Sequence, residues 1–211
     1  MSVRLVLIRH GESNCSLRQV VGGMVGCDGL SDAGMAQAAA LERRLVRTGE
    51  LSSATAFYSS VLRRAVQTAE MIASGVGDGQ LEMVQRCDLC ELHPGDADGL
   101  TWLEYSDKFG DPHWESDPSR PIAPGGESWV DFVDRASDAV ERVASVHPGE
   151  TVVIACHAGV VEATMLKFLP SVTGRLKLRT SNTSITEWEF DDGAWRLVRY
   201  NDSAHLAELG L

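Results

Sequence analysis

The sequence predicts an α/β domain built on a largely parallel sheet, because strand-like and helix-like segments alternate along the chain. Short runs rich in valine, leucine and isoleucine are typical of buried strands, and the longer segments between them repeat their apolar side chains with a helical period. Near the end of the chain, the turn at residues 191–193 separates two further strand-like segments. A turn of this aspartate-glycine type predicts a hairpin, which adds an antiparallel edge to the sheet.

Six strands and four helices are predicted in chain order. The first helix follows Ser31 or Asp32, either of which can cap it, and the clearest helix carries an apolar face from Trp129 to Val143. The predicted strands are residues 2–8, 54–59, 81–89, 151–156, 184–190 and 195–200. The predicted helices are residues 32–48, 61–73, 127–146 and 159–169.

Residues 94–126 are predicted to form an irregular insertion or lid within a single domain that spans residues 1–211. This segment holds five of the seven prolines and many aspartates, and both residue types are typical of loops. Trp102, Phe109 and Trp114 are well spaced within it. These aromatic side chains either pack the insertion or line a substrate pocket, and the sequence favours neither role.

The charge balance excludes some classes of partner. With 19 Lys and Arg against 30 Asp and Glu, the formal net charge is −11 at pH 7. Such a chain lacks the basic surface that nucleic-acid binding needs, although a small anion can still bind in a local pocket. No apolar stretch reaches the roughly 20 residues of a membrane span, and the N-terminal apolar run is too short for a signal peptide. We therefore expect a cytoplasmic protein without nucleic-acid or membrane partners, and no exposed apolar stripe indicates an oligomeric state.

The five cysteines are expected to be free thiols, because an odd number in a chain of ordinary size argues against a disulfide framework. Cys87 and Cys90 form a C-x-x-C pair. A structural zinc site would need a second ligand pair at finger spacing, which the sequence lacks, and a thioredoxin-like pair would open a helix, whereas this segment looks extended. No metal site is therefore expected.

Charged and nucleophilic side chains follow the first four predicted strands, at the point where each strand ends. In parallel sheets, ligands bind outside these carboxyl ends, so we expect the side chains to meet at one edge of the sheet. In the order of the strands that they follow, the residues are Arg9 and His10, then Arg63 and Arg64, then Glu91, and then His157.

This set of residue types suits phosphoryl transfer. Arginine offers forked donors that match phosphate oxygens, and a neutral imidazole is a good nucleophile toward phosphorus near pH 7. A second, protonated histidine could stabilise charge on the transferring group, together with the N-terminus of the helix that follows His157. A carboxylic acid such as Glu91 could protonate the leaving oxygen. The pocket carries its own positive charge, so neither a metal nor another cofactor is expected.

Five ordered motifs resemble those of the histidine phosphatase superfamily, the phosphoglycerate mutase-like proteins. They are Arg9-His10-Gly11-Glu12, the arginine segment at residues 59–69, the Glu-x3-Gly-x3-Gly spacing of Glu91, Gly95 and Gly99, the segment at residues 124–128, and the second-histidine segment at residues 154–159. Residues 29–34, 182–185 and 201–206 match more weakly. Together the motifs extend over almost the whole chain.

The resemblance implies a three-layer α/β/α sandwich and a role for each matched residue. His10 would be the phosphorylated nucleophile, and Arg9, Arg64 and His157 would bind the phosphoryl group. Glu91 would donate a proton to the leaving group and later act as the base for water. Arg63, beside Arg64, is expected to be a solvated surface charge.

The region expected to contact the rest of the substrate departs from the family pattern. Ser16 stands six residues after the nucleophile, where the family often has asparagine, and Asn14 lies two residues earlier. The loop at residues 21–30 is rich in glycine and includes Gly22 and Gly23. Asn14, Ser16, Gly22 and Gly23 are therefore expected to contact the substrate.

The sequence favours a phosphatase over a mutase. Cofactor-dependent mutases of the family are usually longer and keep an Arg-His-Tyr-Gly run directly after the acid, whereas Glu91 is followed by residues 92–95, Leu-His-Pro-Gly. A phosphatase of small phosphorylated metabolites is therefore the leading hypothesis. A phosphoglycerate mutase that depends on a bisphosphorylated cofactor and a non-catalytic interaction module of the same fold are the alternatives, although none of the five catalytic residues is missing.

Overall fold

A six-stranded sheet forms the centre of the molecule. The computed structural model describes residues 1–169 and 178–210, so the predicted domain of residues 1–211 includes nine residues outside the described part. The strands lie in the order β3-β2-β4-β1-β5-β6, in which the pairs among β1 to β4 are parallel and those of β5 and β6 antiparallel. Their bounds are Val3–Arg9 (β1), Ala56–Ser60 (β2), Met83–Arg86 (β3), Thr151–Cys156 (β4), Ile185–Asp191 (β5) and Ala194–Asp202 (β6). The predicted parallel sheet with an antiparallel edge is confirmed.

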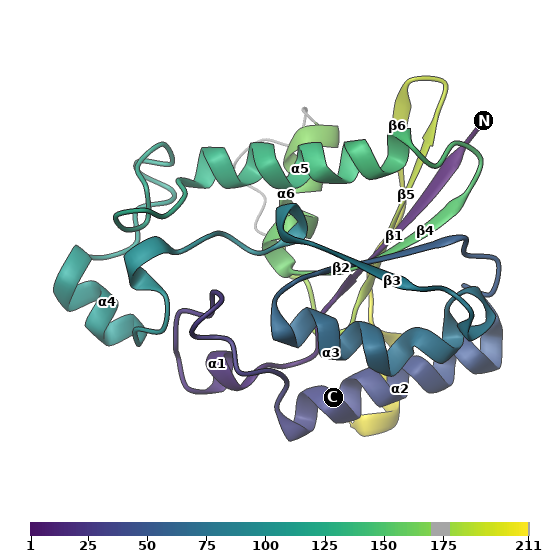
Figure 1. Cartoon of the computed structure of the whole chain (residues 1–211), viewed down its shortest axis with the longest axis horizontal. Coiled ribbons are helices and arrows are strands. Elements are labelled where there is room, and N and C mark those ends of the chain that lie inside the picture. The colour runs from purple at the N-terminus through teal and green to yellow at the C-terminus, as the bar shows by residue number, and fades with distance from the viewer. Residues whose placement is uncertain (170–177, 211) are drawn as a thin grey trace.

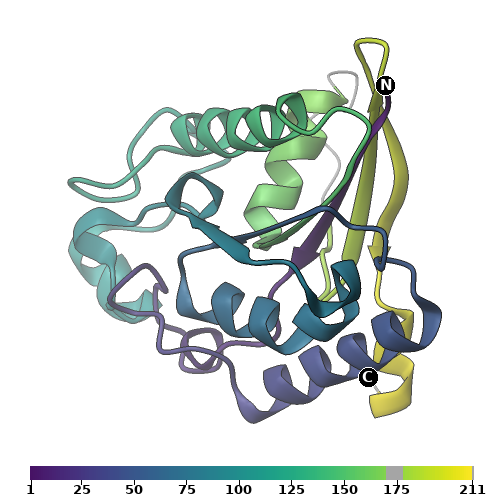
Figure 2. The ribbon, with the colours of Figure 1, turned by 45° about the vertical axis from the view of Figure 1, so that its right-hand side comes forward.

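Helices cover both faces of the sheet and complete a three-layer sandwich. In Figure 1, α5 (Trp129–Ser145) and α6 (Ala158–Phe168) lie above the strands, and α2 (Asp32–Thr48) and α3 (Arg63–Ile72) lie below them; the turned view in Figure 2 shows the same layers. The alternation along β1 explains this arrangement. Leu5 and Leu7 pack in the cluster that holds α5 and α6, whereas Val6 and Ile8 pack in the cluster on the α2 and α3 side. The sandwich implied by the family motifs is confirmed.

Local signals in the sequence explain where several elements begin and end. Ser31 caps α2 by accepting a hydrogen bond from the backbone N–H of Gly34, as predicted, and the helix ends at Gly49, which adopts the left-handed conformation. Between β5 and β6, Asp192 and Gly193 both have positive φ, at 49° and 76°. This is the type I′ geometry that joins paired antiparallel strands without splaying them.

The insertion is more regular than the sequence indicated, because it contains the helix α4 (Trp102–Phe109). Thr101 and Glu104 form a capping box at its start. The insertion has a small core of its own, and Trp102, Phe109 and Trp114 pack against that core rather than standing free. The core is formed by Ala97, Tyr105, Ile122 and Ala123 of the insertion together with Val21 of the glycine-rich loop.

Two further segments differ from the prediction. The third strand ends at Arg86 instead of residue 89, and a single 3₁₀ turn, Cys87–Leu89, follows it, so the C-x-x-C pair is not in an extended segment. A short helix, α1 (Asn14–Leu17), follows the first strand and was not predicted. Within residues 1–169 and 178–210, no helix is long and apolar enough to cross a membrane.

Candidate active site

The two histidines predicted to act together lie side by side because of the pairing of β1 and β4. The last residues of these strands, Arg9 and Cys156, are register partners, so the next residue of each strand leaves the sheet at the same level. Those residues are His10 and His157. Their buried rings lie 5.1 Å apart between centroids and meet edge to face, with 60° between the planes.

The hydrogen bonds of His10 determine which ring nitrogen is free to react. Nδ1 lies 2.6 Å from the carbonyl oxygen of Gly11, and because a carbonyl only accepts, Nδ1 carries the proton. Nε2 therefore has a lone pair, which accepts a 3.1 Å hydrogen bond from Nε of Arg64. The His10 carbonyl accepts hydrogen bonds from the Asn182 side chain and the Thr183 N–H, at 3.2 and 3.3 Å. Nε2 is consequently the nitrogen that can attack a ligand.

Arg64 reaches His10 from the start of α3. Its side chain is only 4% exposed, whereas the neighbouring Arg63 is exposed to solvent, as expected for a surface charge. Ser60 holds this start, because its Oγ accepts a 3.1 Å hydrogen bond from the N–H of Leu62. The Arg64 guanidinium also donates through Nη1 to the carbonyl oxygen of Gly22, at 2.7 Å. Arg64 thus joins His10 to the glycine-rich loop.

Arg9 supplies a second guanidinium to the same place. Its Nη1 donates to the carbonyl oxygen of Thr180, but Nε is buried and has no hydrogen-bond partner among the described residues. Leaving such a donor unsatisfied costs about 1–3 kcal/mol. Burial lowers the pKa of Arg9, with a smaller contribution from Arg64, and the nearby Glu91 carboxylate acts in the opposite direction. An anion bound here would satisfy the free donor.

Both histidines are held in the neutral form. Burial lowers the pKa of His10 well below 6.5, and the charges of Arg64 and Arg9 lower it further. The pKa of His157 is also well below 6.5, because of burial first and then the same two arginines and His10. A neutral His10 suits a nucleophile. The expectation that His157 is protonated does not hold for the free site, since the clustered positive charges oppose a further proton.

Glu91 lies against the N-terminus of α6, the helix that follows His157. Its Oε2 accepts a 3.1 Å hydrogen bond from the N–H of Gly159, and Oε1 accepts a longer one, 3.3 Å, from the N–H of Leu92. The positive end of the helix dipole favours a carboxylate there. Only glycine allows this approach, because a Cβ at position 159 would overlap Glu91 Oε1 and lie 2.9 Å from the ring of Phe132.

Asp98 holds the glycine-rich loop next to the site, a role that the sequence analysis missed. Its carboxylate accepts hydrogen bonds from the backbone N–H groups of Gly23, Val25 and Gly26, at 2.8 to 2.9 Å. A side chain at position 23 would collide with this carboxylate. The signal was present in the sequence, because Asp98 directly precedes Gly99 of the Glu-x3-Gly-x3-Gly motif.

The other tentative substrate-binding residues are engaged by the protein itself. Asn14 donates through Nδ2 to the carbonyl oxygen of Leu30 at 3.0 Å. Ser16 is exposed, and its Oγ lies 2.9 Å from Oγ of Ser13. Their roles in substrate binding stay predictions. Gly22 and Gly23 stay predictions as well, although the contacts with Arg64 and Asp98 place their loop beside His10.

Ser60 is a second residue that the sequence analysis did not single out. It is the last residue of β2, which pairs with β4, and its Oγ lies 2.8 Å from Nε2 of His157. The same hydroxyl donates to Sγ of Cys90 at 3.2 Å. A serine at the end of a strand gives little signal of its own, so only the pairing of the two strands reveals this contact.

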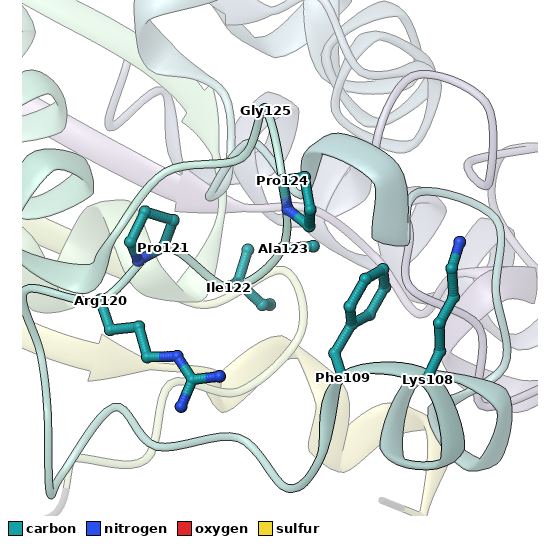
Figure 3. Close-up of a pocket in the computed structure, with 8 residues that line it drawn as sticks. All are labelled: Lys108, Phe109, Arg120, Pro121, Ile122, Ala123, Pro124 and Gly125. Carbon is teal, nitrogen blue, oxygen red and sulfur yellow. The ribbon is translucent and has the colours of Figure 1, made fainter.

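Two surface pockets lie near the insertion. One, of about 330 Å³, is lined by Glu91 together with Gly23 of the glycine-rich loop and Asp98, which holds that loop. The other, of about 460 Å³, lies within the insertion between α4 and residues 120–125. Figure 3 shows Lys108 and Arg120 of this second pocket on either side of Phe109 and Ile122. The first pocket is the one next to the predicted chemistry.

Comparison with known proteins places these observations in a family. Residues 5–203 match the model of the histidine phosphatase superfamily, branch 1. A metal-independent phosphoserine phosphatase of Arabidopsis thaliana is 34% identical over 210 residues, which cover 98% of this chain and 84% of that protein. The phosphoglycerate mutase-like protein 4 of the same plant is 33% identical over 210 residues, covering 98% of this chain and 88% of that protein.

The likeness extends to solved structures. A mycobacterial glucosyl-3-phosphoglycerate phosphatase in complex with VO3 superimposes with a TM-score of 0.73 at 27% identity, over 94% of this chain and 98% of that one. The match to the family model includes the segments of all five catalytic residues predicted from the motifs. The motifs and the comparisons therefore agree on an enzyme of phosphate-ester hydrolysis. The chain belongs to branch 1 of the histidine phosphatase superfamily.

Proposed function

We propose that this protein is a metal-independent phosphatase that hydrolyses small phosphate monoesters through a phosphohistidine on His10. The observation that carries the proposal is the state of His10. Its Nδ1 proton is bound by the Gly11 carbonyl, its unprotonated Nε2 accepts from the Arg64 guanidinium, and the charge of Arg9 also acts on the ring. A neutral imidazole with a lone pair next to an anion site is arranged for attack on phosphorus.

In the first step, the substrate phosphate binds between Arg9, Arg64 and His157. Arg64 Nε, which now donates to His10 Nε2, turns its donors to the phosphate oxygens and so frees the lone pair. Nε2 attacks phosphorus, the bond from phosphorus to the ester oxygen breaks, and the leaving oxygen takes a proton from Glu91. The arginines stabilise the charge on the transferring group, and no metal is needed for that purpose.

In the second step, water removes the phosphoryl group. Glu91, now a carboxylate, accepts a proton from the water as its oxygen attacks phosphorus, and the bond to Nε2 breaks. Inorganic phosphate leaves, and both His10 and Glu91 return to their starting states. The N–H of Gly159 keeps the carboxylate in position through both steps.

Turnover of a chromogenic phosphate ester in EDTA tests the proposal. Activity is expected in wild type and is expected to be lost in His10→Ala, whereas Arg63→Ala, on the exposed side of the same helix start, is expected to keep it. Base-stable, acid-labile incorporation of labelled phosphate would identify the phosphohistidine. Full activity of His10→Ala would contradict the proposal.

The role of Glu91 has its own test. Glu91→Gln removes the acid, so turnover of a substrate with a poor leaving group is expected to fall about 10²–10⁴-fold. A good leaving group needs less protonation, so phosphohistidine still forms from an activated ester and accumulates, because the base for water is also missing. Equal losses in phosphohistidine formation for both substrates would contradict the role as acid.

Two comparisons guide the choice of substrates. Similar proteins are named for phosphoserine and for glucosyl-3-phosphoglycerate, so both belong in a panel with sugar phosphates and nucleotides. The relative named as mutase-like makes the mutase alternative worth testing with a phosphorylated three-carbon acid and its bisphosphorylated primer. Isomerised product in place of free phosphate would favour the mutase. Any efficient turnover would exclude a non-catalytic module.

We also propose that the protein acts in the cytoplasm as one domain and without nucleic acid. The net charge of −11 supports the last point, because a polyanion would be repelled outside the local site. Cell fractionation tests the location. Binding to duplex DNA at low salt would contradict the charge argument.

A further inference from the structure

We propose that Cys87, Cys90 and His93 bind a Zn²⁺ ion beside the active site, with one coordination position left open, and that the bound ion inhibits the enzyme. One ligand atom from each residue lies within 4.8 Å of the other two. The chain offers these ligands as Cys-x2-Cys-x2-His, on the 3₁₀ turn that follows β3 and on the loop behind it. The third ligand is the single residue His93, where a structural zinc finger would have a second ligand pair.

The distances are close to those of a tetrahedral zinc site. With Zn–S near 2.3 Å and Zn–N near 2.0 Å, tetrahedral geometry places two sulfurs about 3.8 Å apart and a sulfur and a nitrogen about 3.5 Å apart. Here Sγ of Cys87 lies 4.0 Å from Sγ of Cys90 and 3.7 Å from Nε2 of His93. Shifts of a few tenths of an ångström suffice for these two pairs, and the remaining pair, Cys90 and His93, lies within 4.8 Å and closes by about 1 Å at most. On binding, two Zn–S bonds and one Zn–N bond form, and the thiol protons pass to solvent.

A carboxylate already orients the histidine for this purpose. Nδ1 of His93 faces Oε1 of Glu127 at 3.5 Å, and the N–H of His93 donates to Oε2 at 2.8 Å. Arg135 holds the same carboxylate in turn, with two hydrogen bonds of 2.6 and 2.8 Å. Metal-binding histidines usually give their second nitrogen to such a carboxylate. Nε2 is thereby left to face Cys87.

Arg135 also holds the backbone that carries the ligands. Its guanidinium donates to the carbonyl oxygens of Asp88, Cys90 and Glu91, at 2.9 to 3.2 Å. A turn fixed in this way loses little conformational freedom when an ion binds. The site is therefore largely preformed.

The exposure of the ligands indicates an accessible site rather than a closed structural one. Cys87 is exposed and the His93 side chain is 39% exposed, so an ion can enter from solvent, whereas Cys90 is buried. Cys87 and His93 line the same pocket as Glu91. Three protein ligands leave the fourth position of the ion to water or to a group in that pocket.

Inhibition of the enzyme follows from the place of the ion in the pocket of Glu91. This part of the proposal rests on the proposed function. Glu91, the acid, lies in the chain between two of the ligands, and a divalent ion in its pocket attracts the carboxylate away from proton transfer. Cys90 is also linked to His157 through Ser60, whose Oγ donates to the Cys90 sulfur at 3.2 Å and lies 2.8 Å from Nε2 of His157. Occupied, the site therefore acts on both Glu91 and His157.

Metal binding is measured with the whole protein, after its thiols have been reduced with a phosphine and any bound metal has been removed. Co²⁺, the spectroscopic probe, is expected to give thiolate charge-transfer and tetrahedral bands at one ion per chain, and Zn²⁺ is expected to displace it. Cys87→Ser and His93→Gln are expected to weaken binding roughly tenfold or more. His113→Gln, a histidine of the insertion outside the cluster, is expected to bind as wild type does. Absent bands, or equal affinity in all four proteins, would overturn the site.

Activity is measured separately, with each protein compared with its own rate in EDTA. Zn²⁺ is expected to reduce the wild-type rate at least tenfold and to have a much smaller effect on Cys87→Ser and His93→Gln. Equal inhibition of the variants would overturn the inhibitory role. His10→Ala separates this proposal from the proposed function, since it is expected to bind Co²⁺ normally without turnover. If wild type lacks phosphatase activity but binds the ion, the proposed function and the inhibitory role fail while the metal site stands.

Discussion

At the scale of single residues, the surroundings of His10 keep its imidazole neutral. Burial and the two neighbouring arginines hold its pKa well below 6.5, so the imidazole stays neutral as the pH falls through 6.5. An NMR titration of histidine-labelled protein, with the signal assigned through His10→Ala, is expected to show a midpoint far below that of an exposed histidine. A midpoint near 6.5 would mean that the arginines do not act on the ring in solution.

Gly159 is the position where one added methyl group changes the site. Gly159→Ala is expected to displace Glu91, because the Cβ would overlap its Oε1 and crowd Phe132. We expect kcat to fall at least tenfold and the free energy of unfolding to fall by about 1–3 kcal/mol, in the range of overpacked cores. Steady-state kinetics and urea denaturation measure the two effects. Ala158→Gly, one residue earlier, is the control, and a similar loss of kcat there would show that the helix start matters more than the clash.

At the scale of elements, an ion-pair network ties the antiparallel edge of the sheet to α2. Arg199 on β6 contacts Glu187 and Glu50 at 2.8 Å and Asp202 at 3.1 Å, and Arg44 on α2 contacts Glu50 and Asp202 at 2.7 Å. These side chains are only 10–23% exposed. Removing one arginine from a network at this depth is expected to lower the free energy of unfolding more than removing an exposed ion pair does.

A pair of variants on one strand measures this network. Arg199→Met is expected to lower the free energy of unfolding by about 1–3 kcal/mol, because three partly buried carboxylates each lose one of the arginines that neutralise them. Arg196→Met, on the same strand, removes a pair to Glu189 in which the arginine is 70% exposed, and is expected to change stability by about 0–1 kcal/mol. Neither residue contacts the site, so kcat is expected to stay unchanged. Equal effects in urea denaturation would show that burial does not strengthen the network.

At the scale of the whole molecule, buried neutral histidines make stability depend on pH. The pKa of His205 is lowered from 6.5 to about 4, mainly by burial, so the unfolded chain binds more protons between these values. The contribution of His205 to the free energy of unfolding is therefore fully present above pH 6.5. It is lost as the pH falls toward 4, and amounts to roughly 1–3 kcal/mol. His10 and His157 act in the same direction. Denaturation at several pH values is expected to give a shallower slope for His205→Gln, and an unchanged slope would contradict the assignment.

The sequence by itself determined the fold class and the five residues of the predicted chemistry. Strand and helix periods are local patterns that the sequence shows directly. The carboxyl ends of parallel strands meet at one edge of the sheet for any loop conformation, so the sequence alone predicts that Arg9, His10 and His157 lie together. The family motifs added the choice of Arg64 over Arg63, which agrees with the burial of one and the exposure of the other.

Only the tertiary structure decided those features of the site that depend on contacts between segments far apart in the sequence. Asp98 holds a loop more than 70 residues earlier in the chain, and Glu127 orients His93 from a distance of 34 residues. The lowered pKa values of His10 and His157 come from burial and from neighbouring charges, which exist only once the sheet has formed. Periodicity and motif spacing describe neighbours along the chain, whereas these contacts are made by neighbours in space.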